Sequence, residues 1–547
     1  MRLEPKPRRL APHDERGFSL ALTIVVLMVV TGLLAGAFDA VFLNTGATRT
    51  DLDQKRALLA AEAGLSIYDQ QLNANPNYWD TCPSGGSTGM TGPTGVPVPG
   101  STEYYSYKTL PATGSTSCSA SSPIPTTIET TGAAAGSFRA EFSGSSGPIT
   151  RTIVAQFQPP SFLNYIYFTN FEILDPAATG DSLTTCSTYY WAAPPASDPN
   201  QSAWGPQRDA ACGGPINFIT GDSLNGPLHS NDDLAICGTP SFGSTSPSSP
   251  DTVETPAMVN PSNCANAPVV NGTVNGTYNN TVGTVQLPAN NAQLLQVADG
   301  STSTHNSGCY PGAGCVFTGP TTIVLNGSAN TMTITNATYA GPNPVPWPSN
   351  GVVYVANSSC SATYSPTNVT YGNDAGCGDA TVSGTYSSSL TIGADNDIMI
   401  NGSITQTGLS TPAAAPSGSA LLGLIANDFV RVTHPCSTSS GNTTTGVYSP
   451  LTNPVIDAAI LALNHSFIVD NFQCGSPLGT LTVWGAIAQN FRGPVGTESG
   501  GSVYSGYVKS YNYDPRLQTL SPPSFLNPVT DWSVDRVTEC GDASGAC

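Results

Sequence analysis

The 547-residue sequence predicts an α+β protein, in which one long N-terminal α-helix precedes a large and mostly β region. Two observations predict this order. No charged residue lies between Arg16 and Asp39, and an amphipathic stretch comes after this apolar segment. The remainder of the chain holds most of the 56 Gly and 46 Pro and consists of short alternating segments separated by turn residues. That pattern is typical of strands and not of helical bundles.

The first element is the apolar segment from Phe18 to Phe38, which includes Leu22 and Leu27. As a helix it would extend about 32 Å, roughly the thickness of a hydrocarbon core. Residues 1–17 carry more cations than acids, so the N-terminus should stay in the cytoplasm and the rest of the chain should lie outside. A secretory signal cleaved near "AGA" at 35–37 and an uncleaved anchor are the alternatives.

The second element is an amphipathic helix that continues to about residue 75, because Pro76 ends the pattern. Its apolar residues have a spacing of three and four, which places them on one face. This stripe, expected to pack on the next strands of the chain, consists of Leu58, Ala61, Leu65, Tyr68 and Leu72.

The start of the chain resembles a known family. "RGFSL", with Gly17 before Phe18, resembles the cleavage site of type IV prepilins, and "AAEAGL" after the apolar helix resembles PilX-type minor pilins. The resemblance covers about residues 16–75 and implies that a prepilin peptidase cuts after Gly17. Most pilins carry Glu at the fifth mature position, which is thought to pair with a neighbouring subunit's amine. Leu22 stands there instead, which puts ordinary packing within a filament in doubt.

The remainder of the chain divides by composition. With 1–17 as leader and 18–75 as helix, we expect a small pilin-like β region at 76–160 and a large outer β domain at 161–547. A hairpin is expected between Ser137 and Gln158, where apolar and polar residues alternate on both arms.

A faint repeat predicts the architecture of the outer domain. Four segments begin with Asn and reach an apolar pair within a few residues: "NDDLAICG" at 231, "NDIMINGSI" at 396, "NDFVRVT" at 427 and "NHSFIVDN" at 464. Short strands with Asn and Gly at the corners are typical of a β-solenoid. The spacing is irregular, so a β-sandwich with long loops is the alternative.

Cysteine usage predicts disulfides in an oxidising, extracytoplasmic compartment, because the 14 Cys are scattered and no C-x-x-C occurs. Connectivity cannot be deduced from sequence. The simplest scheme joins sequence neighbours: Cys82–Cys118, Cys186–Cys212, Cys237–Cys264, Cys309–Cys315, Cys360–Cys377, Cys436–Cys474 and Cys540–Cys547.

Charge and motifs argue against several functions. The net charge is −19 and only nine Lys or Arg come after residue 76, so we expect no nucleic-acid partner. His229 beside Asp232 and Asp233 is weak evidence for a catalytic triad, and the carboxylates stand singly in turns, so we expect no enzyme. Calcium could bind oxygen ligands at 395–397 or 373–379, but Asx residues at turns more often cap the backbone. We expect no metal and no other cofactor.

The resemblance implies a structural subunit of a type IV pilus near the tip, acting in pilus assembly or cell adhesion. Its partners would be other pilin subunits, the assembly machinery, prepilin peptidase and the membrane. The main alternative is a membrane-anchored adhesin outside any filament. A β-helix enzyme acting on polysaccharide is a further alternative.

Overall fold

A computed structural model describes residues 18–74, 78, 95–112, 115, 127, 137–158, 161–187, 212–214, 216–244, 251–259, 273–280, 283–300, 307–361, 364–367, 369, 371, 376–436, 449–499, 502–518, 520–528 and 533–540. The chain divides into two compact units. Unit 1 comprises Met1–Thr127, Phe138–Phe157 and Val534–Cys547, and unit 2 comprises Ile128–Ser137 and Gln158–Ser533. The fold is therefore α+β, with an N-terminal apolar helix before a large β region.

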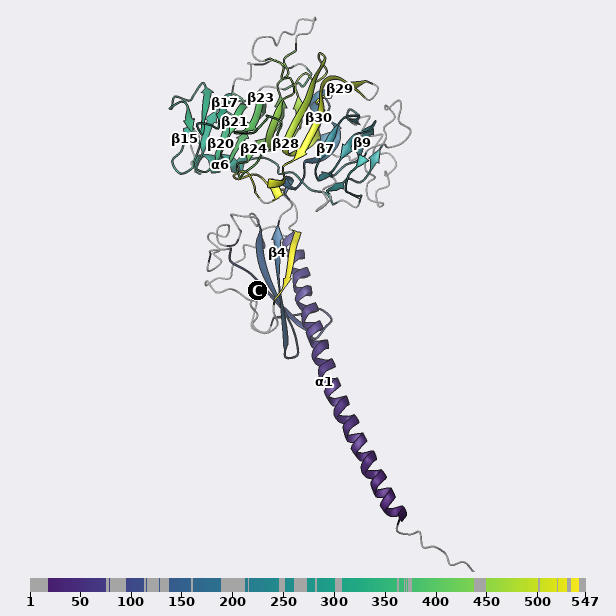
Figure 1. Cartoon of the computed structure of the whole chain (residues 1–547). Helices are drawn as coiled ribbons and strands as arrows, with labels where there is room; N and C mark the ends of the chain where they lie inside the picture. The colour runs from purple at the N-terminus through teal and green to yellow at the C-terminus, as the bar shows by residue number, and fades with distance from the viewer. Residues whose placement is uncertain are drawn as a thin grey trace, which may run out of the picture. The chain divides into compact units, whose positions relative to one another are not determined.

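Unit 1 is built on α1, a single helix that runs from Phe18 to Ala74 without interruption (Figure 1). A sheet of order β1-β2-β3-β4-β31 belongs to the same unit, with antiparallel pairing from β1 through β4. The strands are β1 (Val96–Pro97), β2 (Tyr104–Thr109), β3 (Phe138–Ser146), β4 (Ile149–Gln158) and β31 (Ser533–Glu539). The expected hairpin is present as β3 and β4, and Phe138 pairs with Phe157.

The C-terminal segment belongs to a different unit from the one that the sequence predicts. Composition predicts one outer domain over residues 161–547, but Val534–Cys547 belongs to unit 1. There β31 joins the β4 edge of the sheet, and the backbone N–H of Cys540 donates to the carbonyl of Thr152 at 2.9 Å. The larger segment of unit 2, Gln158–Ser533, is therefore inserted between β4 and the C-terminal segment of unit 1, a connection that local sequence patterns cannot reveal.

Small residues allow the sheet of unit 1 to approach α1 closely. Ala57, Ala60 and Ala61 are buried on the helix face, where Gly144 of β3 crosses it. A Cβ added at Gly144 would lie 2.3 Å from the backbone nitrogen of Ala61, which is far inside contact distance. Gly64 likewise meets the ring of Tyr105. The "AAEAG" element therefore acts as a flat contact surface for the sheet.

The expected stripe is rotated slightly relative to the buried face. Ala61, Tyr68 and Leu72 are buried, whereas Leu58 and Leu65 are only half-buried. The helix face is centred on the small residues instead of the leucines, because the sheet backbone needs that space. The core forms around Tyr68, whose ring contacts those of Tyr78, Tyr107, Phe138, Phe142 and Phe157.

Unit 2 contains parallel strands that pair with strands distant in sequence. One set, here called ladder A, has the order β16-β20-β22-β24-β26-β28-β5-β8-β11-β14, and every neighbouring pair is parallel. Its strands are β16 (Cys315–Thr318), β20 (Val352–Ala356), β22 (Leu390–Ala394), β24 (Leu422–Ala426), β26 (Val455–Ala462), β28 (Pro477–Arg492), β5 (Tyr167–Leu174), β8 (Leu228–Ser230), β11 (Thr252–Glu254) and β14 (Thr277–Asn279).

A second parallel set, ladder B, has the order β17-β21-β23-β26-β28-β30-β7-β10-β13 and shares the long strands β26 and β28 with ladder A. Its other strands are β17 (Thr321–Asn326), β21 (Ala380–Tyr386), β23 (Ile398–Gln406), β30 (Ser502–Tyr513), β7 (Ser223–Asn225), β10 (Ser241–Phe242) and β13 (Thr273–Val274). Figure 1 shows the labelled strands β17, β21, β23, β28, β30 and β7 in this order across the unit.

Shorter strands complete the turns. β25 (Val430–Val432) pairs in parallel with β23 and with β27 (Phe467–Val469), and β6 (Phe218–Ile219), β9 (Leu234–Cys237) and β12 (Met258–Val259) form a small sheet. Antiparallel pairs at one end involve β15 (Gly308–Cys309), β18 (Thr331–Asn336) and β19 (Val345–Pro346). β29 (Gly496–Ser499) pairs antiparallel with β30. The short helices are η3 (Phe162–Asn164), α3 (Pro176–Thr179), α4 (Leu183–Cys186), α6 (Ala292–Asp299) and η4 (Pro515–Gln518).

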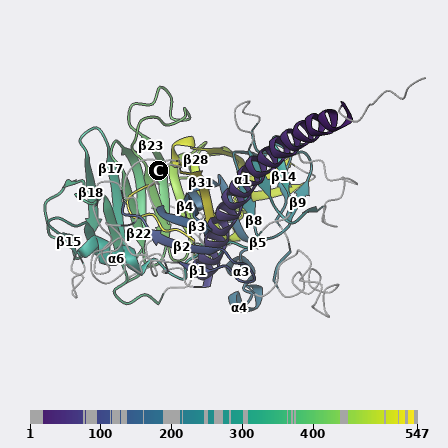
Figure 2. The ribbon, with the colours of Figure 1, turned by 90° about the horizontal axis from the view of Figure 1, so that it is seen from below.

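The chain of unit 2 begins in the middle of its ladders. It enters at β5, proceeds through β8 and β11 to β14, and continues through α6 to β16 at the other end of ladder A. Figure 2 shows β5, β8 and β14 on one side and α6 on the other. From there it returns strand by strand until β28 pairs with β5 and β30 pairs with β7. We call this closure, at which β5 and β7 meet β28 and β30, the seam.

We predict that Gly144→Ala loosens unit 1. The added Cβ would collide with helix backbone, which cannot move aside as a side chain can, so the cost should be about 1–3 kcal/mol. Hydrogen exchange of peptides covering 138–158 measures the effect locally. Ser143→Ala is the matched control, because Ser143 points to the other side of the strand. Equal exchange in the two variants would contradict the close approach.

Candidate functional site

The first half of α1 carries an exposed apolar surface. Among the described residues, Leu20–Phe38 is the one helical span long and apolar enough to cross a membrane, and none of it is buried. Leu22, Leu27 and Phe38 are each more than half exposed. A soluble protein rarely leaves so large an apolar surface in water, so this helix could anchor the chain in a membrane.

The expected processing site lies at the edge of the described residues. α1 begins at Phe18, whose side chain is not described, and Gly17 lies outside the described residues. Cleavage after Gly17 therefore stays a prediction.

In unit 2, asparagines line one corner of the ladders. Asn231 donates to Asn170 at 2.9 Å, Asn170 donates to Asn490 at 2.8 Å, and Asn490 donates to the carbonyl of Asn464 at 3.0 Å. Asn464 continues the chain of contacts to Asp428 at 3.2 Å. Three of the four Asn that open the sequence repeat, at 231, 427 and 464, hydrogen-bond at this corner. The corner amides thus satisfy each other and the backbone where the strands turn.

The apolar residues of the repeat continue from this corner in parallel register. Ile398 pairs with Val430 and Val430 pairs with Phe467, and Ile400, Val432 and Val469 align in the same way. In the sequence repeat, Phe429 occupies the position that corresponds to Ile398. The strand register instead pairs Ile398 with Val430, one residue later. Phe429 is also buried, and its ring stacks on His465 at 4.2 Å. The two adjacent apolar residues make the register ambiguous in the sequence.

Every described cation of unit 2 is paired with a carboxylate of the same unit. Arg431 contacts Asp397 and Asp470, Arg492 contacts Glu172, Lys509 contacts Asp222, and Arg516 contacts Asp514. The first three cations are buried. Burying a charge is costly unless it is paired. These few cations therefore form ion pairs that connect segments inside the unit.

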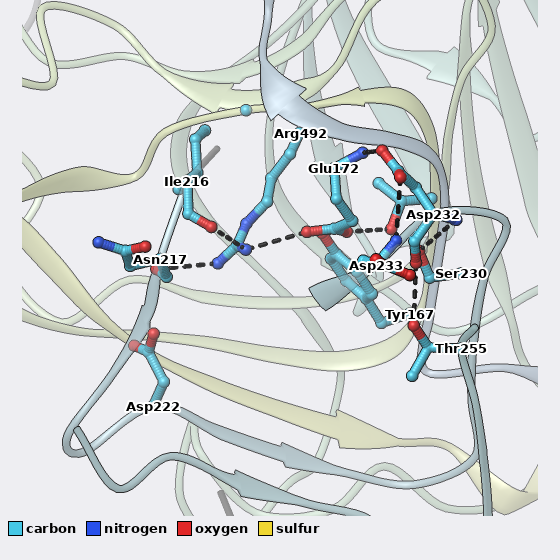
Figure 3. Close-up of polar contacts among 12 residues, drawn as sticks. Tyr167, Glu172, Ile216, Asn217, Asp222, Ser230, Asp232, Asp233, Thr255 and Arg492 are labelled. Carbon is cyan, nitrogen blue, oxygen red and sulfur yellow. Dashed lines mark hydrogen bonds and ion pairs between the residues drawn. The ribbon is translucent and has the colours of Figure 1, made fainter. Parts of the chain in front are cut away.

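Two of these pairs lie at the seam. Arg492, in β28, donates to Glu172 of β5 at 2.9 Å and to the carbonyls of Ile216 and Asn217 at 2.6 and 3.1 Å. Its guanidinium carbon lies 3.5 Å from the centre of the Phe218 ring. Figure 3 shows Arg492 extending between Glu172 and the Ile216–Asn217 backbone.

Glu172 itself is fully enclosed by donors. Its second carboxylate oxygen accepts from Tyr167 at 2.8 Å and from Thr169, and its backbone N–H donates to Asp232 at 3.0 Å. Burial is the main cause that raises the pKa of Tyr167 well above its usual value, so this tyrosine stays a donor. Glu172 therefore joins Tyr167 and Thr169 of its own strand to Arg492 of β28.

The second seam pair joins β30 to the turn before β7. Lys509 Nζ lies 2.7 Å from Asp222 Oδ2, and the Lys509 backbone N–H donates to Asp222 Oδ1 at 3.2 Å. The backbone N–H of Ile219 also donates to Asp222 Oδ2, at 3.1 Å. The sequence pattern predicts Asp222 as a single carboxylate in a turn, and the structure places it in the interior beside a lysine.

A third contact at the seam involves Asp175. Its carboxylate binds His465 at 2.9 Å and Ser466 at 2.7 Å, across about 290 positions of the chain. It also caps α3 by accepting from the backbone of Ala177. One side chain therefore ends β5 and attaches it to the turn before β27.

The residues considered for catalysis or calcium do not converge. His229 is 3% exposed, and its ring nitrogens contact Glu254 and Asn231 at 2.8 and 3.0 Å. Asp395 accepts from Tyr354 and from the backbone of Asn357 at 2.5 and 2.8 Å, and Asp397 pairs with Arg431. No three metal-ligating side chains gather among the described residues, and residues 373 and 374 lie outside them.

Four cysteine pairs of the neighbour scheme are present as disulfides: Cys186–Cys212, Cys309–Cys315, Cys360–Cys377 and Cys436–Cys474. Cys237 and Cys540 are also disulfide-bonded. The remaining cysteines of the scheme, Cys82, Cys118, Cys264 and Cys547, lie outside the described residues.

Sequence reasoning missed Glu172, Arg492 and Lys509. A signal was present, because each cation interrupts an apolar alternation, in "VWGAIAQNFR" and "GYVKSYNY". A charged residue at an inward strand position needs a buried partner. The partner could not be identified from sequence, because it lies about 300 positions away.

No protein-family model matches the chain, and no curated protein does. A solved structure that aligns with it is the competence-associated pilin ComZ from Thermus thermophilus. The alignment covers 89% of this chain and 97% of that one, at 13% identity and a TM-score of 0.23. Two structures with so low a score superpose too poorly for the likeness to support a functional argument.

We predict that Arg492→Met destabilises unit 2 by about 3–5 kcal/mol, because it leaves Glu172 buried without its cation. Chemical denaturation combined with hydrogen exchange in β5 and β28 measures the loss. Lys55→Met, in the exposed pair with Asp51, should change stability by no more than about 0.5 kcal/mol. Adding Glu172→Gln to Arg492→Met should recover part of the loss, and a purely additive double variant would contradict the pairing.

Unit 2 should lose stability as the pH rises through neutrality. Burial raises the pKa of Asp457 to about 7. Among the described residues its Oδ1 has no hydrogen-bond partner, while Oδ2 accepts from the backbone N–H of Gln406 at 3.0 Å. A raised folded-state pKa stabilises the fold below the ordinary pKa, and this stability is lost as pH rises through the folded value. Asp457→Asn should therefore raise the melting temperature more at about pH 8 than at about pH 5. The same gain at both values would contradict this assignment.

Proposed function

We propose that this chain is a minor pilin-like structural subunit of a type IV pilus, similar to PilX-type minor pilins, and that it is not an enzyme. One observation carries the proposal, namely that α1 is a single helix with an exposed apolar first half and a second half that packs on a sheet. Such a helix can stand in a membrane before assembly and pack among other helices afterwards. In the sequence, the prepilin-like "RGFSL" includes Phe18, where α1 begins, and "AAEAGL" belongs to the second half of the helix.

We propose further that unit 2 is a β-solenoid displayed outside the cell. Support comes from ladders A and B, in which each strand pairs in parallel with a strand of another turn, and from the asparagine corner. The alternative β-sandwich would be built from antiparallel sheets. A solenoid has no need of a catalytic centre to serve as a stiff outer domain for adhesion.

A position near the filament tip is supported by two features. Leu22 cannot pair with a neighbouring subunit's amine, and a buried amine without a partner is costly. Unit 2 is also far larger than the helix that would carry it, so repeated packing along a thin core would be crowded. A subunit at the tip has no subunit ahead of it and avoids both problems.

Processing is the first test. We predict that the mature protein begins at Phe18 and that Gly17→Glu leaves the precursor uncut, because a bulky charge does not fit where a small residue is expected. Gly17→Ala, which keeps a small residue, should still be cut. N-terminal mass spectrometry of the three proteins measures this, and an intact Met1 end in the wild type would rule cleavage out.

Location is the second test. Gold-labelled antibody against unit 2 should mark filament ends at low density. Labelling along the whole filament would refute the tip position. Protein found in the membrane alone, with filaments unlabelled, would favour the anchored adhesin.

A further inference from the structure

The pair Lys509–Asp222 is unusual for this chain. Lys509 is the only lysine after Lys108, so unit 2 holds one lysine in all. That lysine is at an inward position of β30, between the buried Tyr507 and Tyr511. Its side chain is 9% exposed and that of Asp222 is 0% exposed. Lys509 is therefore not a surface lysine. Among the described residues, Asp222 is the one charged group within hydrogen-bonding distance of its amine.

The attraction between Lys509 and Asp222 does not by itself explain why these two positions carry charged residues. Replacing such a pair by apolar side chains is often neutral or stabilising, because removing two charges from water costs more than their attraction returns. The inward alternation of Tyr507, Lys509 and Tyr511 would accept an apolar residue. The position therefore suggests that the amine and the carboxyl group are needed for their chemistry.

The geometry suits a reaction between them. Nζ lies 2.7 Å from Oδ2, so it is within reach of Cγ, to which that oxygen is bonded. Reacting atoms in a near-attack arrangement lie about 3–3.5 Å apart. Two backbone donors, from Ile219 and Lys509, hold the carboxyl group in place. The donor on Oδ1 is also positioned to stabilise a developing oxyanion.

The surroundings favour the neutral amine that must attack. Burial lowers the pKa of Lys509, although Asp222 opposes this, and the nearby Arg492 adds to the lowering. Nζ also lies 5.8 Å from the centre of the Phe218 ring, and the low exposure of the Lys509 side chain keeps most water away. Transfer of one proton from the ammonium to the carboxylate gives an amine and a carboxylic acid in contact.

We propose that Lys509 and Asp222 form an intramolecular isopeptide bond that locks the seam. The Nζ lone pair attacks Cγ, the Nζ–Cγ bond forms, and the bond from Cγ to one carboxyl oxygen breaks. That oxygen leaves as water with two of the three ammonium protons, and the third stays on the amide nitrogen. The atoms and charges balance without an oxidant, a reductant or a co-reactant.

The bond would have a clear physical effect. It joins two residues 287 positions apart, so it closes a long covalent loop across the junction of β30 with the turn before β7. Parallel strands at the seam could then not separate by unpairing alone. This role does not depend on membership of a pilus, because it concerns only the closure of unit 2.

The test uses the full-length wild-type protein. After reduction and complete denaturation, an amine-acylating reagent should modify Lys55 and Lys108 but not Lys509. Digestion should yield a branched peptide joining the segment with Asp222 to the segment with Lys509, lighter than the two separate peptides by one water molecule. Tandem mass spectrometry should place the link on Nζ. Lys55 and Lys108 serve as controls within the same molecule.

Two outcomes decide the proposal. Lys509 acylated to the same extent as Lys55 and Lys108, with no branched peptide, would overturn it and leave an ion pair only. Asp222→Ala should free Lys509 for acylation and abolish the branched peptide. The denatured state is the one labelled, so this comparison stays valid even where the variant folds poorly.

Discussion

The parallel pairing of β28 and β30 with β5 and β7 is the contact on which unit 2 depends. The chain enters its ladders at β5, in the middle. The late strands β28 and β30 must therefore pair with the early strands β5 and β7. Until they meet, β5 and β28 each expose an unpaired edge, a feature that proteins normally protect. Apolar contacts alone would not specify which strands join, because the ladder strands are similar short apolar segments.

Buried charges supply that specificity. Glu172 in β5 requires a cation, and β28 brings Arg492 at the register that satisfies it. Asp175 likewise meets His465. A register slip by one residue would move each charge to the opposite side of its strand. Because a misplaced buried charge is expensive, the pairs select one closure among many. This selection gives Arg492 a role in the interior of a chain that has few cations.

In unit 1, small residues allow the sheet to pack closely against α1. The sheet lies on the second half of α1, where large side chains would keep the two apart. Ala57, Ala60, Ala61 and Gly64 let β2 and β3 approach the helix backbone, and Tyr68 fills the space further along. The first half of α1 stays exposed and apolar over Leu20–Phe38.

Features that depend on neighbouring residues could be predicted from the amino-acid sequence. These are the bounds of α1, the β3–β4 hairpin and the Asn-led repeat, because each needs only local periodicity or short loops. The remaining features required the folded chain. The insertion of unit 2 before β31, the helix face centred on alanines in place of Leu58 and Leu65, and the partners of Arg492 and Lys509 all depend on residues distant in sequence. Local patterns show that a strand or a charge must be buried, but only the closed fold brings the partner within reach.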